Sequence, residues 1–376
     1  MNLTKHEDSE MPHRSRRKDG YSGLPLAAAS PSRRATLQDV AKDAGVSVSA
    51  VSKVVRGASG VSAHMLETVT SSIERLGYRP HAGARGLRGR SFTVGVMIVD
   101  LLSPFQPEVV QGISAELESS PYQEVVVVGG ISPDRQRRCI EALVDRQVDG
   151  LILVAPWMEV GWIEELAGST PTVVVGLHGA ASNFDTVVDD DREGARLMVE
   201  HLVSLGHRHI VHTSAPSGGK KKPFVLSHTA RREGYELAMK AHGLDPDVVV
   251  TMYTEEGGYR AATEIMSRDA LPTAIFAGAD IAAFGVLRAL EDKGIRVPED
   301  ITITGYDNIY ASTIGRIALT TVDQSGFLTG SVSAKLLLER LNGRGQPVQY
   351  VVGPKLITRS TSAEPRSNAQ SRAGAR

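Results

Sequence analysis

The sequence predicts a small all-α helix-turn-helix headpiece, followed by an α/β body of two lobes that are each a doubly wound parallel sheet. Three observations support this prediction. Residues 36–56 contain two short helical patterns separated by a glycine. From Thr93 onward, apolar runs of about five residues alternate with amphipathic stretches. The chain has 376 residues, of which 41% are hydrophobic, so it is long enough for two or three domains with sizeable cores.

The first 32 residues contain many Ser, Pro and charged residues and no apolar period. Such a segment cannot offset the entropy lost on ordering, so residues 1–32 are predicted to be a disordered extension. Residues 1–90 carry 15 Lys and Arg against 8 Asp and Glu, a net charge of +7, whereas the whole chain has a net charge of −1. This split suggests that only the N-terminal part meets a polyanion, although a solvated basic tail would give a similar count.

The first helix is predicted to begin after Thr36. Threonine is a good N-cap, and Asp39 can reach back to the free N–H groups of the first turn, as in a capping box. Four apolar residues then recur at helical spacing: Leu37, Val40, Ala41 and Ala44. Gly45 ends the helix, because glycine accepts the left-handed conformation that a tight corner requires.

A second helix follows, capped by Ser47, with Val51, Val54 and Val55 facing the first. Its outward face is small, polar and basic: Val48, Ser49, Ser52, Lys53 and Arg56. A helix that enters the major groove needs a slim N-terminal end and a long donor behind it, and Val48, Ser49 and Lys53 fit that need. The alternative is an ordinary helical hairpin whose polar face meets only water.

Ser62 is predicted to cap a third helix, which Gly77 ends. Its expected core residues are Leu66, Val69, Ile73 and Leu76. The linker after it could form one or two helical turns over residues 82–87, but a helix this short is not stable alone, and Gly83 and Gly86 weaken it further. It should fold only when something holds it, and a plain flexible linker is the alternative.

The body is predicted to contain nine strands: Val94–Val99, Val125–Val128, Leu151–Val154, Val173–Val175, Thr186–Val188, Ile210–Thr213, Val248–Thr251, Ala274–Phe276 and Ile301–Thr304. Continuous apolar runs such as Val125–Val128 indicate strands buried on both faces, and therefore parallel sheets covered by helices. Nine strands are too many for one such sheet, so two doubly wound lobes are expected.

The two-helix unit, together with Val61-Ser62 and the stretch LGYRP at residues 76–80, resembles the DNA-binding headpiece of the lactose/galactose repressor (LacI/GalR) family of bacterial transcription regulators. The likeness runs to about Arg359. It implies a hinge helix that pairs with its twin in a dimer and inserts Leu87 into the minor groove. The family hinge usually lacks a glycine before this leucine, whereas this chain has Gly86. The residues expected to contact DNA are Thr36, Ser47, Val48, Ser49, Ser52, Lys53, Arg56, Arg85 and Leu87.

The resemblance also implies a periplasmic-binding-protein-like body. The headpiece is expected at residues 33–80 and the hinge helix or linker at 81–90. The N-terminal lobe is expected at 91–188 with 325–346, and the C-terminal lobe at 189–324 with 347–360. The chain should cross between the lobes near Asp189, Thr321–Gln324 and Gln346. Residues 361–376 are predicted to be a disordered tail, without the leucine heptads of a tetramerising coiled coil.

Ligands of open α/β sheets bind at the carboxyl ends of the strands, so a small effector is expected between the lobes. The candidate effector-binding residues are Ser103, Phe105, Arg231, Tyr253, Asp280, Asp307 and Gln324. By resemblance, Arg231 and Asp307 match a family pair suited to sugar hydroxyls, and Tyr253 matches a stacking aromatic. Asp280 could instead cap a helix, and Arg231 could be a structural ion-pair partner.

Departures from the family pattern leave the effector open. The chain has Ala279 where the family often has Asn, and Gly176-Leu177-His178 where a strand often ends in Asp. A sugar or sugar derivative is the expected class, but an unusual sugar, a nucleoside-like molecule or no effector at all is compatible with the sequence. The basic stretch PSGGKKKP at residues 216–223 could favour an anionic effector, or it could be a solvated loop.

No cofactor, metal site or enzyme chemistry is predicted. Cys139 is the only cysteine, which excludes an intrachain disulfide and fits a reducing cytoplasm. Residues 218–220 lack P-loop spacing, no Gly-x-Ser-x-Gly elbow occurs, and the histidines at 201, 207, 209 and 212 straddle a helix end and a strand start. No apolar run reaches the roughly 18 residues that a membrane span needs. A cytoplasmic protein without membrane contact is expected.

Together these features predict a homodimeric transcriptional repressor. It would bind a pseudo-palindromic operator in double-stranded DNA, and a small molecule between its lobes, with carbohydrate as the expected class, would set its affinity. The rival predictions are a cytosolic sugar-sensing binding protein without a regulatory role and an enzyme that uses the cleft. A regulator that activates transcription or needs no effector also fits.

Overall fold

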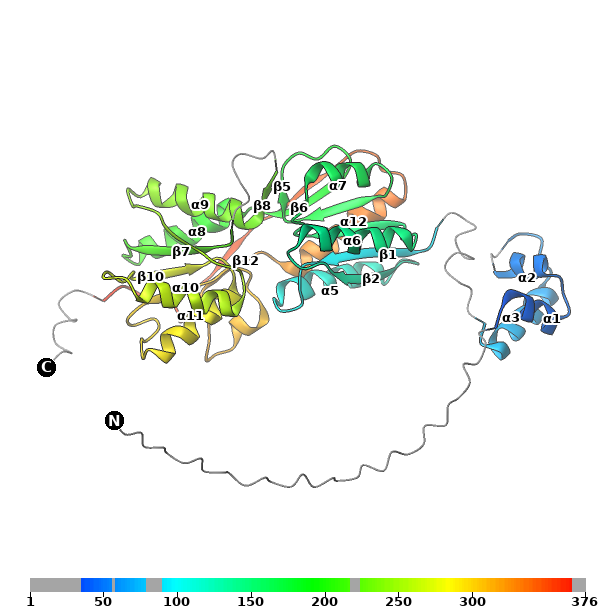
Figure 1. The fold of residues 1–376 in the computed structure, drawn as a ribbon, viewed down its shortest axis with the longest axis horizontal. Helices are drawn as coiled ribbons and strands as arrows, with labels where there is room; N and C mark the ends of the chain where they lie inside the picture. The colour runs from blue at the N-terminus through cyan, green and yellow to red at the C-terminus, as the bar shows by residue number, and fades with distance from the viewer. Residues whose placement is uncertain (1–34, 56–57, 79–89, 217–223, 367–376) are drawn as a thin grey trace, which may run out of the picture. The chain divides into compact units, whose positions relative to one another are not determined.

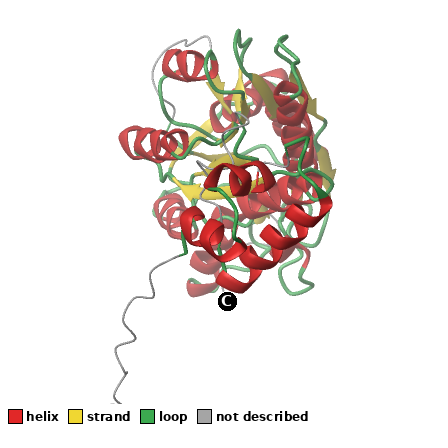
Figure 2. Cartoon of the chain, turned by 90° about the vertical axis from the view of Figure 1, so that its right-hand side faces the viewer, coloured by secondary structure: helices red, strands yellow, loops and turns green. Residues whose placement is uncertain are grey.

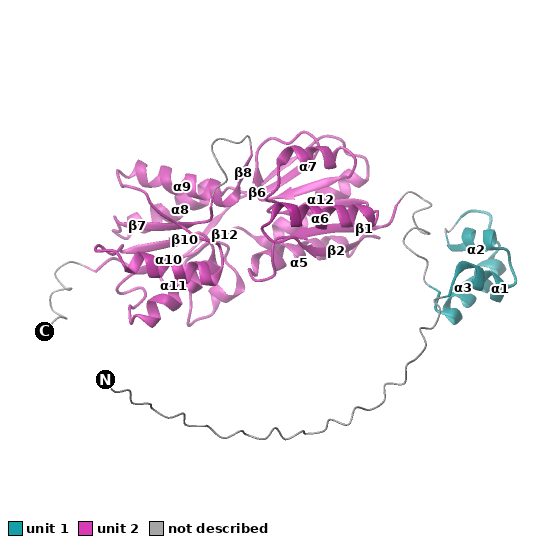
Figure 3. Ribbon diagram, in the orientation of Figure 1, with its two compact units in different colours: residues 1–80 teal, residues 81–376 magenta. Residues whose placement is uncertain are grey.

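The computed structural model describes residues 35–55, 58–78, 90–216 and 224–366. The chain divides into two compact units, residues 1–80 and 81–376, which Figure 3 shows in different colours. The predicted extension at 1–32 and all of the hinge segment except Arg90 lie outside the described residues. Within the described ranges, no helix has both the length and the apolar character that a membrane crossing requires.

The first unit contains three helices, α1 (Leu37–Ala44), α2 (Val48–Val55) and α3 (Ala63–Leu76). They pack around a core that includes Val40, Val51 and Val69, all fully buried. The predicted pattern for α3 is wrong at one position. Leu66 is 50% exposed, and its neighbour Met65 packs against the core instead, because the buried face of α3 is rotated by one residue at its N-terminal end.

The N-terminal lobe of the second unit is a six-stranded parallel sheet. In spatial order its strands are β13 (Gln349–Val352), β6 (Asp185–Asp189), β4 (Thr172–Val175), β3 (Gly150–Val154), β1 (Thr93–Ile98) and β2 (Gln123–Val128). Helices α5 (Phe105–Leu117) and α12 (Gly326–Leu341) enclose a core on one face, and α6 (Pro133–Asp145) and α7 (Val160–Ala167) enclose a core on the other. Figure 1 shows this lobe beside its partner lobe.

The C-terminal lobe repeats the plan with four parallel strands. Their order is β11 (Thr302–Thr304), β10 (Ala274–Ala277), β7 (Ile210–Ser214) and β9 (Asp247–Val250). Helices α8 (Asp191–Ser204) and α9 (Ser227–Ala241) pack on one face, and α10 (Glu255–Met266) and α11 (Asp280–Asp292) pack on the other. In Figure 2 the strands of the body are flanked by helices, as expected for two doubly wound lobes.

Two short antiparallel ribbons join the lobes, and the sequence analysis predicted neither. One pairs β12 (Thr321–Asp323) with β14 (Lys355–Ile357). The other pairs β5 (Leu177–His178) with β8 (Val225–Leu226), which leads directly into α9. Leu226 packs against the core of the N-terminal lobe, so this ribbon holds the start of α9 against the neighbouring lobe.

The predicted lobe boundary after residue 346 is wrong. Strand β13 pairs with β6 in the six-stranded sheet, so residues 349–352 belong to the N-terminal lobe. The third crossing therefore lies between Val352 and Lys355, not near Gln346. Strand β13 lies at the edge of the sheet, and three of its four residues are exposed.

Strand β2 also differs from its prediction. It is an edge strand, paired only with β1, and Val125 and Val126 are 42% and 39% exposed rather than buried on both faces. The predicted tail is wrong in part as well. Residues 361–366 are described and bonded to the C-terminal lobe: the carbonyl of Thr361 accepts a hydrogen bond from the N–H of Ile303, and Ala363 exchanges hydrogen bonds with Thr302.

Helix α12 packs unusually closely on α5. A Cβ atom on Gly330 would lie 1.9 Å from the carbonyl oxygen of Val109, and one on Gly112 would lie 2.0 Å from that of Phe327. Only glycine permits the two backbones to approach so closely. The chain leaves the C-terminal lobe after β12 and enters α12 directly, so this contact fixes the returning segment in the N-terminal lobe.

Candidate functional site

The outward face of α2 is held in place by two capped helix starts. The Thr36 hydroxyl accepts a hydrogen bond from the N–H of Asp39 at 3.3 Å, and the Asp39 carboxylate accepts one from the N–H of Thr36 at 2.8 Å. The Ser47 hydroxyl accepts a hydrogen bond from the N–H of Ala50 at 3.2 Å. Thr36 and Ser47 therefore orient the two helices through their side chains.

The predicted base-reading residues lie together at the exposed side of α2. Val48 is 45% exposed, Ser49 and Lys53 are exposed, and Ser52 is half-buried. Gly45 adopts a positive φ of 66° at the corner before them, as expected of a tight turn. Arg56, Arg85 and Leu87, the other predicted DNA contacts, lie outside the described residues.

A cavity of about 540 Å³ lies between the two lobes of the second unit, and we call it the interlobe cleft. Six of the seven predicted effector residues line it: Ser103, Phe105, Arg231, Tyr253, Asp307 and Gln324. The first two come from the loop after β1 and the start of α5, and the others come from the C-terminal lobe and the crossing after β12. The accessible lining surface is mostly apolar and is combined with polar and charged side chains, which is typical of a small-molecule site.

Asp280 does not line the cleft, contrary to its prediction as an effector contact. Its carboxylate is fully buried and accepts hydrogen bonds from the Ser312 hydroxyl at 2.6 Å, the Thr321 hydroxyl at 2.5 Å and the N–H of Ile309. It makes no side-chain cap of α11 either. Asp280 instead ties the loop after β11 to the crossing strand β12, which leaves no carboxylate oxygen for a ligand.

Arg231 has a different acidic partner from the one predicted. Its Nη2 lies 2.7 Å from Oδ1 of the fully buried Asp191, its Nη1 donates to the carbonyl of Gly278, and its guanidinium carbon lies 3.5 Å from the ring centroid of Tyr306. Burial alone would raise the pKa of Asp191, but the charge of Arg231 and the hydrogen bond from His178 outweigh burial and lower it. The positive charge of Arg231 is therefore already balanced by the carboxylate of Asp191 before any ligand enters.

Asp307 lies buried at the cleft wall with a carboxylate oxygen that accepts a hydrogen bond from Nε2 of Gln324. Burial raises the pKa of Asp307 well above its ordinary value, and the nearby charge of Arg231 only partly opposes that rise. Gln324 thus connects the crossing after β12 to the loop after β11. Both residues were predicted from the sequence, and they lie in direct contact.

Asp189 also lines the cleft, although it was not predicted from the sequence as a site residue. It is 5% exposed, at the end of β6 where the chain first crosses between the lobes. One carboxylate oxygen, Oδ2, accepts a hydrogen bond from the Tyr306 hydroxyl, and the other has no partner among the described residues. Burial, and then the charge of Asp191, raise the pKa of Asp189 to about 8. Its position at the carboxyl end of a predicted strand was the available signal.

A wall of aromatic rings spans both lobes at the cleft. Trp157, which follows β3, stacks on His228 in α9 with ring centroids 5.5 Å apart and an interplanar angle of 24°. His228 in turn meets Tyr253 edge-on at 6.3 Å. Burial and the charge of Arg231 lower the pKa of His228 to about 4, so the ring is neutral at pH 7. The sequence analysis included only Tyr253 of these three.

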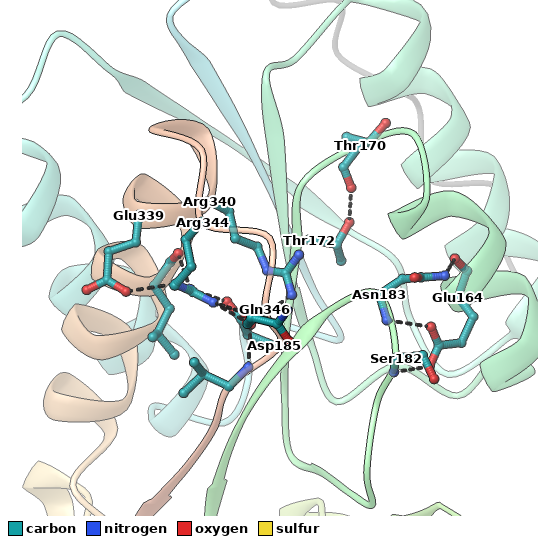
Figure 4. Close-up of polar contacts among 12 residues, drawn as sticks. Glu164, Thr170, Thr172, Ser182, Asn183, Asp185, Glu339, Arg340, Arg344 and Gln346 are labelled. Atoms are coloured by element: carbon teal, nitrogen blue, oxygen red, sulfur yellow. Dashed lines mark hydrogen bonds and ion pairs between the residues drawn. The ribbon is translucent and has the colours of Figure 1, made fainter.

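The far end of α12 carries a second buried ionic cluster, shown in Figure 4. Asp185, fully buried at the start of β6, accepts hydrogen bonds from Arg340 at 2.9 Å, Arg344 at 2.6 Å and the N–H of Val348 at 2.8 Å. Burial raises the pKa of Asp185, but these hydrogen bonds outweigh that effect and lower it. Because Arg90 also donates to the carbonyl of Leu341 at 2.5 Å, this end of α12 contacts the residue at which the chain enters the lobe.

The clustered histidines each have a separate partner. His207 bonds to Thr273 and Ala363, His212 to the carbonyl of Phe276, and His209 to Asp247. Among the described residues, no group of three or more His, Cys, Asp or Glu side chains could hold a metal ion.

Comparison with known proteins finds relatives for both units. A family model for bacterial regulatory proteins of the lacI family matches residues 36–81, and one for a periplasmic binding protein-like domain matches residues 199–362. Catabolite control protein A of Priestia megaterium is 34% identical over 82% of this chain and 92% of its own length. The HTH-type transcriptional repressor PurR of Haemophilus influenzae is 32% identical over 87% of this chain and 98% of its own length.

Solved structures agree with this assignment. The lac repressor dimer bound to operator and the anti-inducer ONPF is 28% identical, with a TM-score of 0.74, and the match covers 88% of this chain and 100% of that one. The transcriptional regulator CelR in complex with cellobiose is 29% identical, with a TM-score of 0.64 and the same coverage. The headpiece and the two-lobed body therefore occur together in proteins of known structure.

Proposed function

Because the chain belongs to the lacI family of bacterial regulatory proteins, we propose that it is a dimeric, sequence-specific transcriptional repressor. A small molecule bound in the interlobe cleft, with a sugar or sugar derivative as the expected class, sets its affinity for the operator. One observation carries the proposal. The same chain contains a capped helix with an exposed polar face and a cavity between two lobes that polar side chains line. The protein works in the cytoplasm, where its operator lies.

In the proposed complex, α2 enters the major groove. Val48 and Ser49, at its N-terminal end, approach base edges closely because they are small, and Lys53, one turn later, reaches a guanine edge with its ammonium group. Thr36 and Ser47 fix the helix starts through their side chains, and both belong to the proposed contact surface. Arg56, Arg85 and the minor-groove residue Leu87 complete the proposed contact surface.

Two copies of the chain form the proposed dimer. Apolar side chains remain exposed on β2, at the start of α12 and on the loops after β1 and β11: Val125, Val126, Leu101, Leu102, Phe327, Leu328, Tyr310 and Ile314. Exposed apolar side chains on an edge strand, which also offers free backbone groups, suit a contact with a second chain. The lac repressor in the matched operator complex is a dimer. In a dimer with two-fold symmetry, each headpiece would read one half of a palindromic operator.

The coupling route proposed here runs along α12. Its N-terminal end follows Gln324 and Ser325 at the cleft, and its C-terminal end accepts a hydrogen bond from Arg90 at the entry of the chain. A ligand that changes the angle between the lobes would shift Gln324 and hence the helix behind it. Coupling between two sites is typically about 1–3 kcal/mol and must be reciprocal, so operator DNA must change ligand affinity by the same factor.

The aromatic wall supports a second ligand class for the same cleft. Trp157, His228 and Tyr253 present flat apolar surface to whatever binds. The apolar face of a sugar suits such a surface, and so does the ring of a nucleoside. CelR was solved with cellobiose, which supports the carbohydrate class for a relative of this chain.

The decisive experiment is selection of genomic fragments by the full-length chain, followed by gel shift of the enriched sites. Enrichment of a pseudo-palindromic sequence, with a mobility consistent with two chains per site, is the expected result. A chain that retains no selective binding to any duplex would overturn the proposal and leave the sugar-sensing binding protein as the better explanation. The same gel shift in the presence of sugars and nucleosides tests control by an effector.

A further inference from the structure

The chain enters the N-terminal lobe through Arg90, Ser91 and Phe92, which we call the entry segment. Asp149, the residue before β3, holds two of its residues. Its Oδ1 accepts hydrogen bonds from the N–H of Ser91 at 2.7 Å and from the Ser91 hydroxyl at 3.1 Å, and its Oδ2 accepts one from the N–H of Phe92 at 2.7 Å. One carboxylate therefore fixes two successive peptide groups of the entry segment.

Phe92 has a backbone conformation that phenylalanine rarely adopts. Its φ is 54°, in the left-handed region where the Cβ atom of an L-residue crowds the backbone. A residue other than glycine stays in this region only when its surroundings hold it there. The hydrogen bond to Asp149 does so, together with the one that the Phe92 carbonyl accepts from the N–H of Gln123 at 3.0 Å. Without Asp149, the backbone at Phe92 is expected to relax and to turn the residues before it.

Arg90 connects the entry segment to a second element. Its Nη2 donates a hydrogen bond to the carbonyl of Leu341 at the end of α12, and its Nη1 donates one to the hydroxyl of Tyr122 at 3.5 Å. Asp149 and Arg90 therefore fix neighbouring residues of the entry segment to β3 and to α12. The segment follows the orientation of the lobe because two elements of the lobe hold it.

Strand β3 also joins Asp149 to the interlobe cleft. The strand begins directly after Asp149, its last residue is Val154, and Val154 lines the cleft together with Ala155 and Trp157. Strand β1, which follows the entry segment, pairs with β3 in parallel. The entry segment and the cleft thus lie at opposite ends of the same two strands, and Asp149 is not among the residues that line the cleft.

The entry segment is the only covalent path from the body to the headpiece, because the whole headpiece precedes it in the chain. In a dimer that binds two half-sites, the two chain ends must leave their lobes with a separation and direction that match the operator. A segment fixed at successive peptide groups keeps the direction that the lobe gives it. A segment free to rotate would lose that direction.

From these contacts, and resting on the repressor function proposed above, we propose that Asp149 is a positioning residue for operator binding. It holds the entry segment so that the lobe sets the direction in which each chain continues to its headpiece. Asp149 acts through Ser91 and Phe92 rather than by contact with DNA or with the effector. The start of β3 is thereby a second anchor for the headpiece, in addition to the end of α12.

Hydrogen exchange of the full-length chain tests the anchor without DNA. Asp149→Asn keeps the volume of the side chain but offers one acceptor oxygen instead of two, so at least one N–H of Ser91 or Phe92 loses its partner. Exchange over residues 90–93 is expected to be faster than in wild type, and exchange over β10 in the other lobe is expected to be unchanged. Asp145→Asn, at the exposed end of α6, is the matched control and should change neither. Equal exchange over residues 90–93 in Asp149→Asn and wild type would show that Asp149 does not hold the segment.

Operator binding by the same preparations tests the positioning role. The probes are the duplex that genomic selection enriches and a scrambled duplex of equal length, measured well below the unfolding temperature. Asp149→Asn is expected to bind the enriched duplex at least about fivefold more weakly than wild type and the scrambled duplex equally well. A purely structural role would lower the unfolding temperature and leave this ratio unchanged. The proposal is therefore overturned if Asp149→Asn and Asp145→Asn show the same ratio.

Arg90→Gln supplies an independent variant, because the Arg90 side chain is exposed and its replacement should not prevent folding. Since Arg90 and Asp149 hold the same segment, the loss of operator affinity in the double variant is expected to be smaller than the product of the two single losses. Fully multiplicative losses would mean that the two residues act separately, contrary to the proposal. A wild-type chain that enriches no duplex would contradict the repressor function and, with it, the positioning role, whereas the exchange measurement would still decide whether Asp149 holds the entry segment.

Discussion

The Nε2 atom of His178, on the N-terminal lobe side of the cleft, donates a hydrogen bond to Oδ2 of Asp191 in α8 of the C-terminal lobe at 2.7 Å. Oδ1 of the same carboxylate accepts from Arg231, so one buried side chain joins both lobes and the principal cation of the cleft. His178 belongs to the stretch Gly176-Leu177-His178, which departs from the family pattern, and the structure places a cross-lobe contact there.

Replacing Asp191 with Asn should therefore destabilise the body strongly. The change leaves the buried Arg231 without its counter-charge, and breaking one partner of a buried ion pair typically costs about 3–5 kcal/mol. Chemical denaturation followed by circular dichroism measures the loss. Glu233→Gln is the control, because Glu233 forms an exposed pair with Arg192 that is worth at most about 1 kcal/mol. Equal losses for the two variants would contradict the assigned role of Asp191.

Asp189 should make the stability of the protein depend on pH in an unusual direction. Its pKa is raised from 3.8 to about 8 in the folded chain, so its carboxyl group favours folding below about pH 4, and that contribution is lost as pH rises toward 8. Unfolding free energy measured between pH 5 and 8 should fall more in wild type than in Asp189→Asn.

Comparison of the two chains cancels the other groups that titrate near the cleft. Asp307 has a raised pKa, His228 has a lowered one, and Asp191 has a lowered one, and the substitution leaves all three groups in place. Parallel pH profiles for wild type and Asp189→Asn would show that the buried carboxyl group does not titrate as assigned.

Lys53→Ala should relax operator selectivity. Loss of a donor to a base edge typically costs about 1–3 kcal/mol at the base that it reads and leaves the other positions unchanged. Selection from a randomised operator library measures this as lost preference at one position in each half-site. Lys42→Ala, on the exposed side of α1, is the control, because it removes the same positive charge outside α2 and should change the affinity for all sequences alike. An unchanged preference in Lys53→Ala would remove Lys53 from the base-reading set.

Val126→Asp should produce a monomer. Val126 is 39% exposed on the edge strand β2, and a carboxylate buried there without a partner costs several kcal/mol in the dimer but little in the monomer. Sedimentation velocity gives the mass directly. Leu237→Asp changes an even more exposed apolar residue, 63% exposed on α9, and should leave the dimer intact. A dimeric Val126→Asp would place the interface elsewhere.

The two tryptophans should respond differently to the effector. Trp157 lines the cleft, whereas Trp162 in α7 packs under the guanidinium of Arg137 at 5.1 Å. Ligand binding should therefore change the fluorescence of wild type and of Trp162→Phe but not of Trp157→Phe. A ligand signal that survives in Trp157→Phe would place the ligand outside the cleft.

Nine strands and three headpiece helices could be predicted because their signals are local. Continuous apolar runs mark strands such as β3, and capping residues such as Thr36 mark helix starts. The four ribbon strands contain only two or three residues each, and their partners lie far away in the sequence, so no local period reveals them. Exposure of Val125 likewise depends on the absence of a neighbouring strand beyond β2, which only the assembled sheet shows.

The site residues also divide into those with a local sequence signal and those whose role depends on the assembled structure. Residues after the carboxyl ends of strands, such as Ser103 and Asp307, were predicted because a parallel sheet brings those ends together, and Arg231 was predicted by resemblance to the family. Asp280 follows a strand as well, but three donors from the loop after β11 and from β12 turn it inward. Trp157 and Asp189 were missed because their importance depends on the closed cavity that they share.

Helix α12 has 16 residues and is about 24 Å long, with the crossing from Gln324 at one end and Arg90 at the other. Because each residue turns an α-helix by about 100°, one residue inserted in the middle of α12 would rotate either Arg340 away from Asp185 or Gly330 away from α5. Natural relatives should therefore conserve the length of this segment more strictly than its sequence. Gain or loss of single codons within residues 331–339 should abolish the response to the proposed effector while leaving both lobes able to fold.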